Sequence, residues 1–267
     1  MPISLEGKTV IVTCATQDLG RTIAQRFLDA GAMVMLADGD EKAPANAEAG
    51  LIGDEERFAR FHYVAQDKLC ITNLIAATTE RFGEIDVLVN SAQNAVTQGQ
   101  FLEISVDDFD ASIGPNVRAV FQLSQAVAKR MLEKERDEDE PAGTIVNISS
   151  IAARRTVPGL LAFSVASAAL EQLTRSMAAS LAGHGVRVNA VAIGGVLTER
   201  LKEAMREHDD LREDMIRVTP MQRLAEMDEA ADTALFLASP HASYITGQIV
   251  AVDGGRTLLD PLSSPNR

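Results

Sequence analysis

Residues 9–37 read TVIVTCATQDLGRTIAQRFLDAGAMVMLA, and this stretch sets the pattern for the whole chain. An apolar, β-branched run (9–13) is followed by a helical stretch (19–30), which Gly31 ends, and then by a second apolar run (32–37). Two buried strands joined by one helix predict a parallel pair, because parallel neighbours need a long crossover connection.

The same alternation continues to the C-terminus. Further strands are expected near 61–64 and at 85–90, 143–148, 186–191 and 248–252, and further helices at 68–82, 106–133, 160–182, 198–217 and 226–238, with a polar, Ala-rich helix after the second strand. This order predicts an α/β fold, a single doubly wound domain spanning residues 1–267 with helices on both faces of a parallel sheet. The domain includes an acidic loop at 133–142, which is either a solvated loop or a docking patch for a partner. It ends in a C-terminal tail at 256–267.

Composition excludes several classes of function. The chain has 25 Lys+Arg and 38 Asp+Glu, a formal charge of −13, which argues against nucleic acid and anionic membranes as partners. Its apolar fraction of 46% is ample for a large core. The N-terminus lacks the features of a signal peptide, and Cys14 and Cys70 have no metal-ligand spacing, so we expect a cytoplasmic protein without a metal site.

Several segments carry motifs that stand in a familiar order. They are FGEIDVLVN (82–90), GTIVNISS (143–150), RVNAV (187–191), TGQ (246–248) and VDGG (252–255). In these motifs, and along nearly its whole length, the chain resembles the short-chain dehydrogenase/reductase superfamily. The resemblance implies a Rossmann-type fold with a seven-stranded sheet, a nicotinamide cofactor and usually a tetramer.

The phosphate-binding loop departs from the family pattern. The family reads T-G-x-x-x-G-x-G, whereas residues 13–20 read TCATQDLG, so Cys14 and Asp18 replace two glycines and only Gly20 remains. Asp18 places a carboxylate where a diphosphate belongs, a repulsion of about 4 kcal/mol at about 4 Å and an effective dielectric of 20, or about three orders of magnitude in affinity. We expect Asp18 to cap its own helix instead. The enoyl-reductase branch of the family, however, binds NAD without the full glycine set.

Other cofactor positions have also changed. Asp38 stands where the family has an acidic residue that accepts hydrogen bonds from the adenosine ribose. It is a retained cofactor ligand, a relic of one, or an ordinary turn residue, and the sequence does not decide among these. The family's N-N-A-G motif begins at Asn90 and ends in Gln93 instead of glycine. We therefore expect a degenerate cofactor site and no cofactor in this chain; its positions are Cys14, Asp18, Gly20, Asp38 and Asn90.

The family's catalytic Asn, Ser, Tyr and Lys are kept only in part. Asn116 and Ser150 match the first two, but Phe163 stands 13 residues after Ser150, where the Tyr belongs, and Ser167 takes the place of the Lys. Phenylalanine has no proton to donate and serine no cationic charge, although general acid–base catalysis is typically worth 10²–10⁴-fold. The Tyr-x6-Lys arrangement of enoyl reductases also fails, because Leu170 occupies the Lys position. These vestigial positions predict no intact catalytic residue.

No other residue is placed to restore this chemistry. The remaining tyrosines, Tyr63 and Tyr244, occupy no motif position near Phe163, and no lysine lies between Lys134 and Lys202.

The core motifs are kept while the chemical positions are lost, which predicts that the fold is retained for assembly. Our leading hypothesis is a non-catalytic subunit that pairs with a catalytically active paralogue, an NAD-dependent alcohol or hydroxyacyl dehydrogenase, in an α2β2 tetramer; NAD would bind to the partner. The chain is similar in this respect to the inactive subunit of the two-subunit hydroxyacyl-CoA-type dehydrogenase of anaerobic toluene breakdown. The small residues of the helix at 160–182 would let subunits approach closely.

Two alternatives remain open. One is a divergent NAD-dependent oxidoreductase that interconverts alcohols and ketones and takes its proton from water or Ser150. The other is a sensor that binds a small molecule in the vacated pocket.

Overall fold

The computed structural model describes residues 3–15, 18–39, 54–91, 96, 99–135 and 140–259. Seven parallel strands form one sheet in the order β3-β2-β1-β4-β5-β6-β7. The strands are β1 (Thr9–Thr13), β2 (Met33–Asp38), β3 (Phe58–His62), β4 (Val87–Asn90), β5 (Gly143–Ser150), β6 (Val186–Ile193) and β7 (Ile249–Val252). The predicted doubly wound α/β fold is therefore confirmed.

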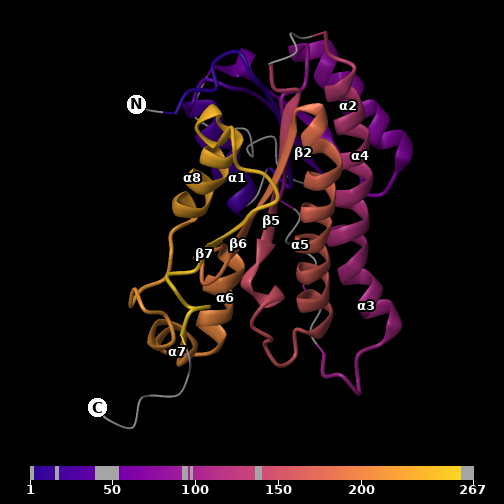
Figure 1. Ribbon diagram of the computed structural model, residues 1–267. Coiled ribbons are helices and arrows are strands. Elements are labelled where there is room, and N and C mark those ends of the chain that lie inside the picture. Colours follow the sequence, from indigo (N-terminus) through magenta and orange to yellow (C-terminus); the bar gives the residue numbers. More distant parts are fainter. Residues whose placement is uncertain are drawn as a thin grey trace.

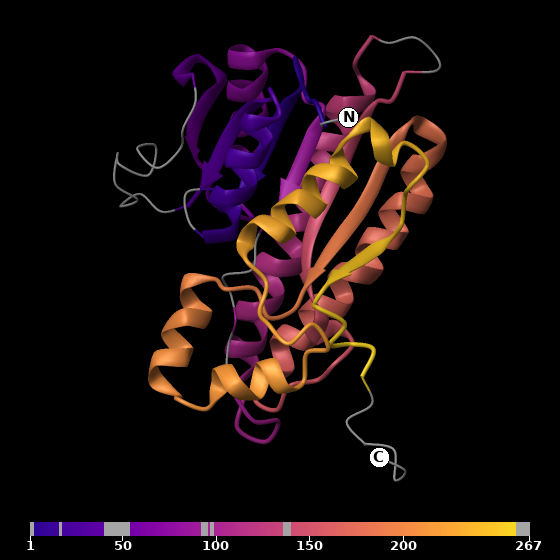
Figure 2. The ribbon, with the colours of Figure 1, turned by 90° about the vertical axis from the view of Figure 1, so that its left-hand side faces the viewer.

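Helices cover both faces of this sheet (Figure 1). On one face lie α1 (Asp18–Asp29) and α8 (Met227–Ala238), and on the other lie α2 (Lys68–Phe82), α4 (Ala119–Leu132) and α5 (Leu161–Leu181). Two shorter helices, α6 (Glu199–Glu207) and α7 (Leu211–Arg217), project beyond the sheet at the lower left of Figure 2. Single 3₁₀ turns occupy Glu55–Arg57, Ile151–Ala153, Ala182–His184 and Pro240–Ala242.

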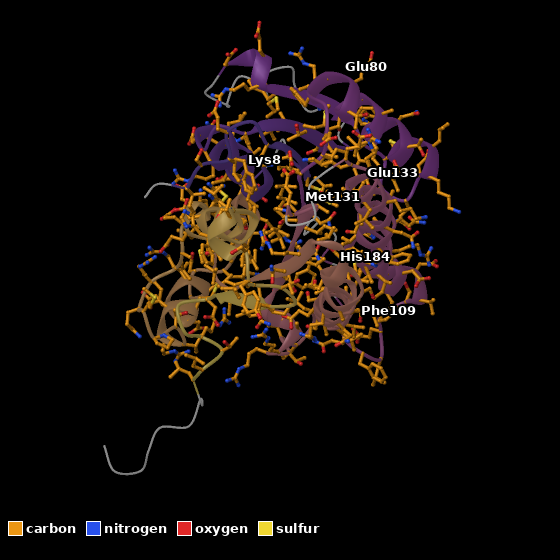
Figure 3. The ribbon with its side chains drawn as sticks, turned by 45° about the horizontal axis from the view of Figure 1, so that its top comes forward. Lys8, Glu80, Phe109, Met131, Glu133 and His184 are labelled. Carbon is orange, nitrogen blue, oxygen red and sulfur yellow. The ribbon has the colours of Figure 1, made fainter. Side chains whose placement is uncertain are left out.

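Strand β1 explains why both faces need a cover. Successive side chains of a strand point to opposite faces. Val10 and Val12 accordingly pack in the core beneath α1 and α8, while Ile11 packs in the core beneath α2 and α4. All three are fully buried. In the second core Met131 of α4 points inward, whereas Glu80 of α2 lies at the periphery (Figure 3).

The predicted helix at 106–133 is an uninterrupted helical run that contains a π-helical turn. It consists of α3 (Val106–Ile113), a π-helical turn (Gly114–Arg118) and α4. Pro115 has no backbone N–H to donate to the preceding turn, so the α-helical hydrogen bonding changes to the π-helical pattern there.

Three other predicted elements also differ. The predicted third strand at 61–64 lies at 58–62, and its polar alternation fits its place at the edge of the sheet. The predicted helix at 198–217 is divided into α6 and α7. The Ala-rich helix expected after β2, and the centre of the acidic loop, lie outside the described residues.

Gly20 holds the first turn of α1 close to the end of β1. A Cβ at this position would lie 2.0 Å from the carbonyl oxygen of Cys14. We expect Gly20→Ala to lower the free energy of unfolding by roughly 1–3 kcal/mol, as overpacking does. Urea unfolding measures this, with Gly183→Ala as the control, because a Cβ at Gly183 meets nothing within 4 Å. Equal effects of the two changes would contradict the close packing.

The start of α8 carries an acid-sensitive ion pair. The Glu229 carboxylate accepts hydrogen bonds from Arg223 at 2.6 Å on each oxygen and from the Glu226 backbone N–H at 3.0 Å. Chiefly through the Arg223 contact, the pKa of Glu229 is lowered from 4.5 to about 2. The pair therefore stabilises the fold above about pH 4.5, and this contribution is lost as the pH falls toward 2.

Both partners are partly exposed, so we expect this contribution to be below about 1 kcal/mol. Glu229→Gln should flatten the pH dependence of urea unfolding between about pH 5 and pH 2. The exposed Glu80, changed to glutamine, is the control. An unchanged acid slope in Glu229→Gln would show that the pair does not contribute.

Candidate functional site

The candidate site lies at the carboxyl ends of the strands, where the strand order reverses beside β1. Open α/β sheets bind their ligands in such a crevice. The backbone N–H of Ser91 donates to Thr13 Oγ1 at 2.9 Å and ties the ends of β4 and β1 together. Two cavities open here, one of about 340 Å³ and one of about 440 Å³, and Cys14 lines both. We call them the first and the second cavity.

Two described residues on either side of the segment after β1 have the left-handed backbone that favours glycine. Cys14 has a φ of 50° and Asp18 a φ of 48°, both in the left-handed region. These are the two positions at which the sequence pattern replaces glycine. A side chain in this region costs about 1 kcal/mol or more per residue, so the loop holds both side chains against a conformational penalty.

The Asp18 carboxylate binds a different helix from the one predicted. Its Oδ1 accepts a hydrogen bond of 2.7 Å from the backbone N–H of Glu199, the first residue of α6. The expectation that Asp18 caps its own helix is therefore wrong. Asp18 is itself the first residue of α1, while the first N–H groups of α6 lack partners within their own helix and accept an outside carboxylate. The loop is thereby joined to α6.

The second cavity surrounds Asp38 at the end of β2. Asp38 is 6% exposed and lines this cavity together with Cys14, Tyr63 and Asn90. Burial, together with the charge of Asp38, raises the pKa of Cys14 to about 12, so its thiol stays protonated at neutral pH. Burial also raises the pKa of Tyr63, with smaller effects from Cys70 and Cys14, so its phenol is a poor proton donor.

Asn90 takes part in a buried polar network. Its Nδ2 donates to Asn147 Oδ1 at 2.8 Å and to Ser124 Oγ at 3.0 Å. Asn147 Nδ2 in turn donates to Thr174 Oγ1 at 2.8 Å on α5. The amide of Asn90 therefore holds β4, β5 and their covering helices in register at the edge of the second cavity.

Two of the four vestigial catalytic positions meet in the first cavity. Ser150 and Phe163 both line it, and Phe163 is 8% exposed. Ser150 Oγ accepts a hydrogen bond of 3.2 Å from the backbone N–H of Ala152 and so begins a 3₁₀ turn. The hydroxyl of Ser150 thus has a local structural role as well as a place in the cavity.

The other two catalytic positions line neither cavity. Ser167 is 4% exposed, and its carbonyl accepts a long contact of 3.5 Å from Ser149 Oγ of β5. Asn116 lies in the π-helical turn, where its Nδ2 donates to the Ser112 carbonyl at 2.9 Å.

The first cavity offers few groups that exchange protons. Its titratable lining residues are Cys14, Asp18, Arg155, Arg200 and Arg256. Within the described part of the chain, no tyrosine, lysine or histidine lines it, and Tyr244 is fully exposed elsewhere. The three arginines were missed by the sequence reasoning. The one sequence feature that could have identified them is their position, because Arg155 and Arg256 each follow a family motif within five residues.

The searched residues, which are those outside the gaps in the described ranges, contain no group of three or more His, Cys, Asp or Glu side chains that could hold a metal ion. Among the same residues, no helix is both long enough and apolar enough to cross a membrane.

Comparison with known proteins identifies the family of this chain. A family model described as enoyl-(acyl carrier protein) reductase matches residues 14–257. An uncharacterised oxidoreductase of Thermotoga maritima is 35% identical over 96% of this chain and 99% of its own length.

Solved structures give the same result. A short-chain dehydrogenase/reductase of Brucella melitensis, described as a glucose/ribitol dehydrogenase, is 30% identical with a TM-score of 0.84, over 96% of this chain and 99% of that one. A 7α-hydroxysteroid dehydrogenase solved with NADH and a 7-oxo bile acid is 31% identical with a TM-score of 0.85, over 94% and 95% of the two chains. The chain belongs to the short-chain dehydrogenase/reductase family, whose members named here are oxidoreductases.

Proposed function

We propose that this chain is a non-catalytic member of an oxidoreductase assembly, a subunit with the family fold that supports an active NAD-dependent alcohol or hydroxyacyl dehydrogenase. The proposal rests on the side chains that line the first cavity. Phe163 lies beside Ser150 where the family places its proton donor, and the described lining supplies no tyrosine, lysine or histidine in its place. The described lining therefore offers no counterpart of the tyrosine and lysine that perform the family's acid–base step, which is typically worth 10²–10⁴-fold.

The loop after β1 does not fit the pyrophosphate of a dinucleotide. The family positions it with glycines whose backbone N–H groups approach the phosphates. Here Asp18 brings a carboxylate to the loop, and that carboxylate occupies the N-terminus of α6. Asp38 keeps a position suited to a ribose, but this position alone does not compensate for the loop, and we propose that the chain does not hold NAD.

One face of α5 is exposed in this chain. Along it Val165, Ala168, Gln172, Ser176 and Ala179 repeat at helical spacing, and Arg175 and Ser180 are exposed beside them. Other small residues of this helix (Ala162, Ser164, Ala166 and Ser167) are buried within the chain and serve its own packing. The exposed stripe therefore supports close approach by a second subunit, for which we propose an active family member.

A turnover assay tests this proposal. The purified chain is incubated with NAD⁺ or NADH and a panel of alcohols and ketones, alone and after co-expression with an intact family member from the same source. We expect turnover only in the co-expressed sample. Turnover by the isolated chain would overturn the proposal.

A divergent NAD-dependent oxidoreductase is the second candidate, and the comparisons favour it, because the relatives are named oxidoreductases or dehydrogenases. In this case Ser150 is the residue in the cavity from which a proton would be relayed. Ser150→Ala should then lower the turnover of the isolated chain at least tenfold. The exposed Ser243, changed to alanine, should leave it unchanged.

A further inference from the structure

We infer that the first cavity binds an organic carboxylate with an apolar body. The inference concerns the same cleft as the proposed function but does not require that function. A pocket without catalytic activity and a substrate pocket would both bind this ligand. It rests on Arg155, Arg200 and Arg256, which line one cavity whose other walls are mostly apolar.

The cavity has a charge opposite to that of the protein. Among the described residues its lining carries three arginines against one carboxylate, Asp18, and the raised pKa of Cys14 keeps that thiol neutral, so this part of the lining sums to 3 − 1 = +2. The whole chain has a formal charge of −13. A positive cleft in an acidic protein concentrates small anions at that place rather than over the whole surface.

Arg256 is the least solvated of the three arginines. It is partly buried, and this burial lowers its pKa. The nearby Asp253 carboxylate acts on the Arg256 charge, while its oxygens accept from the backbone N–H groups of Gly255 at 2.9 Å and Thr257 at 2.8 Å. Its negative charge offsets only part of the burial of the Arg256 guanidinium, and a bound carboxylate would add a direct hydrogen-bond acceptor.

Arg155 lies at the same end of the cavity. Its guanidinium donates to the backbone carbonyls of Thr257 and Leu259, each at 2.8 Å, which places it against the segment that carries Arg256. Arg200 donates to the carbonyl of Val96 at 3.4 Å. The contacts of both residues are to neutral carbonyls, so their charges remain available to an anion.

The other walls select the rest of the ligand. They include Val157, Leu160, Phe163, Ile193, Val196 and Met215. The volume of about 340 Å³ is at the small end of the range for ligand sites, roughly 300–1,000 Å³. A carboxylic acid with one short aliphatic or aromatic body matches both the apolar walls and the small volume.

Calorimetric titration of the full chain tests the inference with 3-phenylpropionate and, as its neutral match, 3-phenylpropionamide, at pH 7 and low salt. We expect the acid to bind at least tenfold more tightly than the amide. Arg256→Gln and Arg200→Gln should each weaken the acid about tenfold, because each removes a charged hydrogen-bond donor. Arg212→Gln, on the exposed side of α7, should change nothing. Arg200 is exposed, so its variant remains informative if Arg256→Gln does not fold.

Equal binding of acid and amide would overturn the inference, as would full affinity in both cavity variants. Displacement of the acid by an equal concentration of inorganic phosphate would also overturn it, since the cavity would then hold any anion. Acid binding by an isolated chain that also turns over NAD would overturn the proposed function alone. A chain that supports a partner but does not bind the acid would overturn this inference alone.

Discussion

Asp18→Gly is expected to raise the affinity of the chain for NADH by about three orders of magnitude. The carboxylate and a diphosphate about 4 Å apart repel by about 4 kcal/mol at an effective dielectric of 20. The change removes this charge and frees the Glu199 N–H at the start of α6, which Asp18 now occupies. Its φ of 48° suits glycine, so the loop keeps its shape. Titration with NADH, followed by its fluorescence, measures the dissociation constant.

Asp18→Asn tests whether the charge of Asp18 or the size of its side chain weakens the binding of NADH. It keeps an acceptor for the Glu199 N–H and tolerates the left-handed backbone, but it carries no charge. We expect it to recover most of the gain. If neither variant binds NADH more tightly than the natural chain, repulsion by Asp18 is not what weakens the site, and the side chain of Cys14 becomes the next candidate.

The second large effect concerns catalysis. In a chain that carries Cys14→Gly and Asp18→Gly, adding Phe163→Tyr with Ser167→Lys should raise ketone reduction by roughly 10²–10⁴-fold, the usual value of a general acid. Phe163 already lines the cavity beside Ser150, so a phenol there would reach a bound carbonyl. Initial rates of NADH oxidation with a panel of ketones measure the gain.

The controls for this prediction address folding and position. Ser167 is buried, so thermal unfolding of the lysine variant must show a cooperative transition before its rate is interpreted. Phe121→Tyr, on an exposed part of α4, should leave the rate at background. A natural chain that reduces the same ketones as fast as the repaired one would show that a proton donor is already present.

The fold could be predicted from local pattern because buried parallel strands and amphipathic helices leave strong periodic signals. β1 and α1 lie within one residue of their expected bounds, and both cores form where the apolar runs place them. The π-helical turn was missed because Pro115 is also compatible with a simple kink or a helix start. The shift of β3 reflects an edge strand, whose polar alternation is a weaker signal.

The site was predictable only where residue types decide the chemistry. The replacements at 14, 18, 163 and 167 can be read directly from the sequence. The partner of the Asp18 carboxylate could not be, because Glu199 is 181 residues away and only the fold brings α6 to the loop. The three arginines of the first cavity come from helix α6 (Arg200) and from two separate loops (Arg155 and Arg256), and no spacing in the sequence links them.

The most direct test of the central claim is the native mass of the complex purified from its source, with subunits and bound nucleotide resolved in one spectrum. We predict a heteromer that contains this chain and an active family member, with bound nucleotide equal in number to the partner subunits alone. A homo-oligomer that carries one nucleotide per copy of this chain would contradict the account.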